Sequence, residues 1–226
     1  MYPINLNMKG CQAAVFGGGT VALRKLKRLL AEDACVTLVS PELCPELKKL
    51  VQELPKERLV WHKLRHMDFC WPAEKGFRLV FAATDSQEAN HEIALKARQY
   101  GILVNNATDP DECDFQVPSR VCRGNLDLTV STAGESPALS RLLRQDLEAR
   151  YHDGFGEFLA WLGEMRRKLW QRESRTAIRQ KLWRQAMTPE VFNYILNHRL
   201  EQAKNEVRRK IDCAGAESSD SPRRDS

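Results

Sequence analysis

The stretch that decides the fold is CQAAVFGGGTVALRKLKR, residues 11–28. Gln12–Phe16 is short and apolar and predicts a strand, and the apolar residues after the glycines recur at helical spacing. Gly17, Gly19 and Ala22 fit the pattern G-x-G-x-x-G/A at the junction of strand and helix. In this pattern the glycines permit a tight turn and a close approach of the backbone to a pyrophosphate, which the helix N-terminus attracts. The stretch therefore predicts a dinucleotide-binding turn.

The length and composition narrow the class of protein. A chain of 226 residues forms one large or two small domains. No apolar run approaches the roughly 18 residues that span a bilayer, and the first residues lack the order of a secretory signal. We therefore expect a cytoplasmic protein with no membrane partner. The cysteines lie at 11, 35, 44, 70, 113, 122 and 213, without a C-x-x-C pair.

The scattered cysteines predict reduced thiols rather than a disulfide framework. They also argue against a structural zinc site, which requires closely spaced ligands. His66 and Cys70 lie near each other in the sequence, but two ligands without partners are more often packing or surface residues. We therefore predict no bound metal.

The net charge of +5 is unevenly distributed, with basic residues dense between 141 and 210. We interpret them as the solvated faces of helices. A nucleic-acid partner is not predicted, because no groove-reading motif accompanies the charge. A small polyanionic substrate is an equally good reason for local positive charge.

The first half of the chain alternates between strand and helix patterns. Strands are expected at 13–16, 35–39, 59–62, 77–82 and 102–105, and helices at 21–31, 46–53 and 87–100. This alternation predicts an α/β fold with a Rossmann-like, doubly wound parallel sheet. Ligands of such sheets bind beyond the carboxyl ends of the strands. The turn around Thr84 should therefore face the cofactor.

The end of the second strand bears on the choice of cofactor. In many NAD-binding folds an acidic residue there holds the ribose hydroxyls. Here Ser40, Pro41 and Glu42 follow the strand, so the role is unfilled or falls to Glu42. No arginine follows immediately to receive a 2′-phosphate, which favours NAD over NADP without settling the choice.

Five segments, in order, resemble the N-terminal module of sirohaem synthase, the precorrin-2 dehydrogenase and sirohydrochlorin ferrochelatase family. The resemblance runs from Tyr2 to about Tyr151. The segments are YPINLNMKG (2–10), GGGTVALRK (17–25), FAATDSQEAN (81–90), VNNATDPDECDFQVPS (104–119) and LDLTVSTAGESPALSRLLR (126–144).

The resemblance implies oxidation of precorrin-2 to sirohydrochlorin with NAD, followed in many members by insertion of Fe²⁺ as a substrate. It also implies a homodimer whose strands interlock, and we expect its interface to include the strands around residues 117–121 and 126–130. The run LDLTV (126–130) alternates apolar with polar residues, which independently predicts a partner strand. We expect no methyltransferase module in this chain. The expected domains are 1–112 for NAD binding, 113–150 for dimerisation, 151–212 for a C-terminal helical domain and 213–226 for a disordered tail.

The resemblance also implies the cofactor contacts. They lie in the glycine turn, after the second strand and after the fourth strand. The matching positions are Gly17, Gly18, Gly19, Thr20, Val21, Pro41, Glu42 and Thr84.

The catalytic aspartate of the family lies in the turn after the fifth strand. A gapless alignment places Thr108 there, with Asp109 next to it. Either a one-residue shift lets Asp109 serve, as a base or as a carrier of metal and pyrrole protons, or one activity is altered, chelation above all. The alternative is that Asp109, before Pro110, only shapes a turn. Asp114 is the second candidate.

Cations and a helix start are the candidate contacts for the substrate. Arg120, Arg123 and Arg141 could pair with tetrapyrrole carboxylates, because a guanidinium binds a carboxylate with two parallel hydrogen bonds. Ser136 before Pro137 is first of all a helix cap, although the same helix start could hold a carboxylate.

The helical stripes between 155 and 211 predict core or interface. Two further interpretations remain beside the bifunctional enzyme. One is a dehydrogenase that has lost chelation, and the other is a non-catalytic carrier or sensor of nucleotide or tetrapyrrole.

Overall fold

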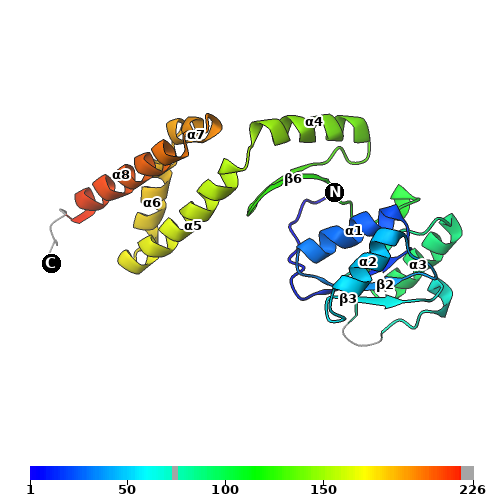
Figure 1. Ribbon diagram of the computed structural model, residues 1–226. Coiled ribbons are helices and arrows are strands. Elements are labelled where there is room, and N and C mark those ends of the chain that lie inside the picture. The colour runs from blue at the N-terminus through cyan, green and yellow to red at the C-terminus, as the bar shows by residue number, and fades with distance from the viewer. Residues whose placement is uncertain (73–75, 220–226) are drawn as a thin grey trace. The chain divides into compact units, whose positions relative to one another are not determined.

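The computed structural model describes residues 1–72 and 76–219 and divides into two compact units, Met1–Val117 and Pro118–Ser226 (Figure 1). The boundary between the units follows Val117. The domain ranges expected from the sequence, 1–112, 113–150 and 151–212, stay a prediction; residues 118–150 of the expected dimerisation segment and the expected helical domain fall in the second unit.

The first unit is built on five parallel strands in the order β3-β2-β1-β4-β5. This is the doubly wound arrangement that the alternating pattern predicted. The order reverses at β1, so the carboxyl ends of β1 and β4 form the switch point where ligands of such sheets bind. The strands are β1 (Gln12–Phe16), β2 (Cys35–Val39), β3 (Leu59–His62), β4 (Leu79–Ala82) and β5 (Leu103–Asn106).

Helices cover both faces of this sheet, α1 and α2 on one and α3 on the other (Figure 1). Because successive side chains of a strand point to opposite faces, Ala13 and Val15 of β1 pack with α1 and α2, whereas Ala14 and Phe16 pack with α3. The helices are α1 (Thr20–Ala31), α2 (Pro45–Glu53) and α3 (Gln87–Gln99), with short 3₁₀ turns η1 (His66–Asp68) and η2 (Pro110–Glu112).

Two strands begin later than their apolar patterns suggested. The strand expected at 77–82 begins at Leu79, because Phe77 packs into the core from the preceding loop. The strand expected at 102–105 runs from Leu103 to Asn106, because Ile102 bonds back to Ala97 at the end of α3.

The second unit contains an antiparallel hairpin and five helices among its described residues. Arg120 pairs with Thr129 across the hairpin, and α4 packs on both strands. The first hairpin strand is β6 (Ser119–Arg123), two residues later than expected, and the second is β7 (Leu126–Val130). The helices are α4 (Pro137–Arg150), α5 (Gly154–Arg172), α6 (Thr176–Ala186), α7 (Pro189–Leu196) and α8 (Leu200–Ser219).

The helices of this unit start where the sequence suggested and continue further than expected. Ser136 and Thr188 accept bonds from the first turns of α4 and α7, each followed by a proline. The tail expected to be disordered from 213 is helical to Ser219, where α8 ends. The rest of that tail, 220–226, lies outside the described residues.

Candidate functional site

A cleft of about 670 Å³ opens at the carboxyl ends of β1, β2 and β4. We call it the glycine cleft, because the turn from β1 into α1 forms one wall. Backbone turns after β2 and β4 form the others. All eight positions expected to contact a cofactor line it: Gly17, Gly18, Gly19, Thr20, Val21, Pro41, Glu42 and Thr84.

The fold itself requires two of the three glycines. Gly17 has a φ of +122°, and a Cβ there would overlap the carbonyl oxygen of Ala83 after β4. A Cβ on Gly18 would overlap the carbonyl oxygen of Glu42. Gly18 thus lets the turn after β2 approach the turn after β1, a requirement that the motif did not reveal.

Gly19 is different, because the fold does not require it to be glycine. Its backbone is extended, and a Cβ there would have no neighbouring atom within 4 Å. It precedes α1, whose first turn has no acidic residue and, among the described residues, no side-chain cap. The start of α1 lines the cleft beside this open space, and amide groups at such a helix start can bind an anion such as a pyrophosphate.

A buried amide joins the turns that follow β4 and β5. Asn90 of α3 is fully buried, and its Oδ1 accepts bonds from the amide (2.9 Å) and the hydroxyl (2.8 Å) of Thr84. Its Nδ2 donates to the carbonyl oxygen of Thr84 (3.2 Å) and to the hydroxyl of Thr108 (3.2 Å). Asn90 therefore holds the wall of the glycine cleft against the turn that precedes Asp109.

Asp109 lines a second cleft of about 610 Å³, not the glycine cleft. We call it the acidic cleft; it is lined by Gln87, Glu88, His91, Glu92, Asp109 and Glu112. His91 pairs with Glu112, and Glu92 pairs with His66 at 2.7 Å. The first turn of α3 separates the two clefts, since Ser86 and Ala89 line one and Gln87 and Glu88 the other.

The local role of Asp109 is that of a turn former. Its Oδ1 accepts the amide of Asp111 at 2.9 Å and so begins η2. The amide and the hydroxyl of Thr108, the preceding residue, both donate to the side-chain oxygen of Asn106. These contacts leave the second carboxylate oxygen of Asp109 available to the acidic cleft.

Asp114 lies in neither cleft. Its Oδ2 accepts the amide of Val104 at 2.9 Å, and its Oδ1 pairs with Arg98 at 3.3 Å. Both oxygens thus hold β5 to α3.

The four residues expected to bind substrate belong to the second unit, and three have structural partners. Arg120 pairs with Asp127 across the hairpin at 2.5 Å, and Arg123 donates to carbonyl oxygens at the end of α4. Ser136 caps α4. Arg141 is exposed on that helix.

Lys25 and Cys113 form a half-buried pair beside Asn105. The Lys25 Nζ donates to Asn105 Oδ1 at 2.9 Å, and the Asn105 amide contacts Cys113 Sγ at 3.4 Å. Burial, with Arg24 and Arg28 nearby, lowers the pKa of Lys25 to about 8. Burial also raises the pKa of the Cys113 thiol.

Sequence reasoning missed several residues of the glycine cleft, above all Arg65 and His66. They follow β3, and no motif marks them. The signal that could have found them is the strand order, because β3 lies next to β2 and its carboxyl end opens on the same side.

Residues 1–72 and 76–219 contain neither a cluster of metal-ligating side chains nor a membrane-spanning helix. No group of three or more His, Cys, Asp or Glu is placed there to hold a metal ion. None of the helices in this part of the chain has the length and apolar character needed to cross a bilayer.

The sheet, its switch point and the uncapped helix start define a dinucleotide-binding protein, and comparison with known proteins agrees. Residues 4–119 match the family described as putative NAD(P)-binding, and residues 123–150 match the central segment of sirohaem biosynthesis proteins. The chain belongs to this NAD(P)-binding family, in the form of the N-terminal module of sirohaem synthase.

Individual relatives are consistent with this family. The chain is 32% identical to a siroheme synthase of Photorhabdus laumondii over 93% of its own length and 43% of the relative's. A siroheme synthase of Nitrosospira multiformis is 33% identical over 93% of this chain and 44% of the relative. The chain thus spans less than half the length of these curated relatives.

A solved structure extends the likeness across both units. SirC, precorrin-2 dehydrogenase, is 25% identical and superimposes with a TM-score of 0.69. The match covers 93% of this chain and 98% of that one.

Proposed function

We propose that this protein is a precorrin-2 dehydrogenase of sirohaem biosynthesis that uses NAD. The observation that carries the proposal is the glycine cleft, an anion-accepting turn at the switch point of the sheet, in a chain that matches SirC over nearly its whole length. The eight lining residues from Gly17 to Thr84 named above are its proposed coenzyme contacts.

The coenzyme requires three things that this cleft offers. The amides at the start of α1 bind the pyrophosphate, and the open space at Gly19 admits it. The carboxylate of Glu42, after β2, suits the ribose hydroxyls. When bound, NAD supplies the hydride acceptor, and the protein contributes position and charge.

The proton that leaves with the hydride needs an acceptor. Asp109 is the proposed base, because it lines the acidic cleft, which the first turn of α3 separates from the glycine cleft. Asp114 is a weaker candidate, since one of its oxygens bonds to Val104 of β5 and the other to Arg98 of α3. For the carboxylates of the substrate we propose Arg141 first, because Arg120, Arg123 and Ser136 already have structural partners.

Anaerobic incubation of the purified chain with precorrin-2 and NAD tests the activity. NADH should form in proportion to sirohydrochlorin. Binding of NAD and tetrapyrrole without NADH formation would instead identify a carrier or sensor. Asp109→Ala should lower the rate by roughly 10² if the residue is a general base. A full rate in that variant would leave Asp109 as a turn former.

Ferrochelation is the second proposed activity, favoured by the siroheme synthase relatives and by the carboxylates of the acidic cleft. Fe²⁺ is here a substrate, for which carboxylate oxygen is a plausible transient ligand. Because Thr108 replaces the family's aspartate, we expect this activity to be the weaker one. Formation of sirohaem from sirohydrochlorin and Fe²⁺, measured beside NADH formation, tests it separately.

A homodimer is proposed from the apolar surface of the second unit. Leu139, Leu142 and Leu143 of α4 are 48%, 64% and 43% exposed, and the alternating strand β7 lies beside that helix. Leu142→Glu should shift the protein towards monomer in sedimentation. A wild-type monomer at micromolar concentration would contradict the proposal.

A cytoplasmic location is proposed as well. The cysteines whose side chains the structure describes are free, which suits a reducing compartment.

A further inference from the structure

Arg65 brings a positive charge into the glycine cleft from a strand that the sequence pattern did not connect with it. Of the described residues that line the cleft, the charged ones are Glu42, Arg65 and Asp85, with His66 as a titratable neighbour. Arg65 is the one lysine or arginine among them. The cleft therefore has two positive elements, the start of α1 and this guanidinium.

The segment that carries Arg65 is anchored to the sheet rather than loose. Phe69 packs edge-on against Phe16 of β1, with ring centroids 5.5 Å apart. His66 pairs with Glu92 of α3 at 2.7 Å. The carbonyl oxygen of Arg65 accepts the amide of Asp68 at 3.1 Å, which begins η1. The backbone of Arg65 is thus held at the rim of the cleft.

The side chain of Arg65 keeps most of its binding capacity. Its Nε donates to Asp68 Oδ2 at 3.3 Å, and the side chain is 66% exposed. The two terminal nitrogens have no hydrogen-bond partner within residues 1–72 and 76–219. A planar guanidinium that lines the cleft suits a phosphate, which it binds with two parallel bonds.

The position of Arg65 relative to Glu42 indicates what it would bind. Val39 at the end of β2 lies opposite His62 at the end of β3. Glu42 and Arg65 follow these neighbouring ends and line the same cleft. In such folds the residue after the second strand faces the ribose of the adenosine, and an arginine nearby accommodates a 2′-phosphate. We therefore expect a 2′-phosphate on the adenosine ribose to lie near both Glu42 and Arg65.

We propose that Arg65 makes the glycine cleft accept NADP as well as NAD, by binding the 2′-phosphate of the adenosine. The proposal rests on the coenzyme site proposed above and adds a specificity residue to it. Glu42 serves the unphosphorylated ribose, and Arg65 offsets the repulsion between Glu42 and the phosphate. Arg65 contributes little to NAD, which has no group at that position.

Calorimetric titration of the full chain with NAD and with NADP tests this specificity. In the wild type the two dissociation constants should agree within about tenfold. Arg65→Ala should weaken NADP roughly tenfold or more and leave NAD within about twofold, because a charge-assisted bond is lost for one ligand only. The NADP affinity of Arg65→Lys should lie between those of the wild type and Arg65→Ala, since lysine keeps the positive charge but cannot form two parallel hydrogen bonds.

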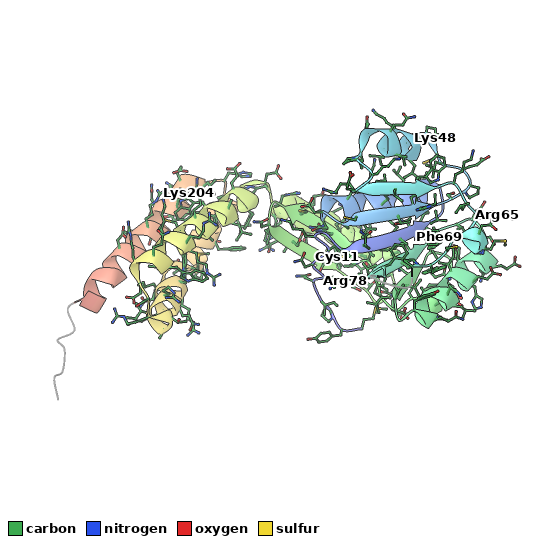
Figure 2. The ribbon with its side chains drawn as sticks, turned by 90° about the horizontal axis from the view of Figure 1, so that it is seen from below. Cys11, Lys48, Arg65, Phe69, Arg78 and Lys204 are labelled. Carbon is green, nitrogen blue, oxygen red and sulfur yellow. The ribbon has the colours of Figure 1, made fainter. Side chains whose placement is uncertain are left out.

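Lys48→Ala is the matched control, since Lys48 is an exposed cation of α2 outside the cleft lining (Figure 2). It should change neither affinity. Adenosine 2′,5′-bisphosphate against 5′-AMP repeats the comparison with the adenosine end alone. An NADP affinity unchanged in Arg65→Ala, or an equal loss for both coenzymes, would overturn the proposal. Failure of the wild type to bind either coenzyme would instead refute the coenzyme site itself.

Discussion

The glycine cleft and the acidic cleft lie on either side of the first turn of α3, yet they are built in different ways. The glycine cleft is shaped by backbone, at Gly17, Gly18 and the turns after β2 and β4. The acidic cleft is shaped by side chains of α3 and η2, several already paired with one another. Backbone walls demand particular residue types locally, whereas a side-chain wall depends on partners far along the chain. The first kind of site is therefore readable from a motif and the second is not.

The largest effect should separate the glycines that the fold needs from the one it does not. Gly18→Ala places a Cβ on the carbonyl oxygen of Glu42, so the turn after β2 must move. We expect a loss of stability of about 3 kcal/mol, seen as a lower midpoint in thermal unfolding. An unchanged midpoint would mean that the two turns do not touch, and that the glycine cleft is less closely determined by backbone.

The next largest effect concerns Asn90, whose side chain joins the turn after β4 to the turn after β5. Asn90→Ala removes a buried amide and leaves the Thr84 amide without its partner, which should cost about 2 kcal/mol. Coenzyme affinity should fall as well, because Thr84 lines the glycine cleft. Asn197→Ala is the control, because the side-chain amide of Asn197 is exposed and donates to the backbone carbonyl oxygen of Asn193. If both variants unfold alike and bind alike, Asn90 does not couple the two turns.

Gly19→Val should weaken NAD binding and leave stability nearly unchanged, whereas Gly18→Ala should mainly lower stability. The fold has room for a side chain at Gly19, where no atom lies within 4 Å, so stability should change little. The side chain would fill the space proposed for the pyrophosphate and weaken NAD at least tenfold, about 1.4 kcal/mol. Calorimetric titration measures the NAD affinity. Full affinity in a folded Gly19→Val protein would show that the coenzyme does not bind at this turn.

The smallest effect concerns Lys25, whose charge state is set by packing and not by either cleft. Its pKa is lowered to about 8 in the folded protein, so the folded state prefers the neutral amine. The unfolded chain binds the proton more tightly, and this contribution to stability therefore rises as the pH increases from about 8 towards 10.5.

Lys25→Met removes that contribution. Scanning calorimetry in buffers at about pH 7.5 and about pH 9.5 measures the melting temperatures of both proteins. The melting temperature of the wild type, relative to that of Lys25→Met, should be higher at the higher pH. Both proteins carry Cys113→Ala, because the raised pKa of the Cys113 thiol lowers stability as alkaline pH ionises the unfolded thiol, and that pKa itself depends on the charge of Lys25. A constant difference would show that Lys25 is not desolvated.

The sequence by itself determined the elements and the class of site. Alternation of apolar strands and amphipathic helices predicted the parallel sheet, because each period is a local requirement of burial. The glycine pattern predicted the turn, because a positive φ at Gly17 is a local demand on the backbone. Serine and threonine before proline marked the starts of α4 and α7, because their side-chain oxygens accept amide groups of the first helical turn, which is also a local requirement.

Only the tertiary structure decided which side chains meet. It placed Arg65 in the glycine cleft, Asp109 in the acidic cleft and Asp114 against β5. It also showed that Gly18 is constrained by Glu42, a residue that follows a different strand. The physical reason is common to all four. Strand order and crossover connections bring distant segments to one edge of the sheet, and no local periodicity records that neighbourhood.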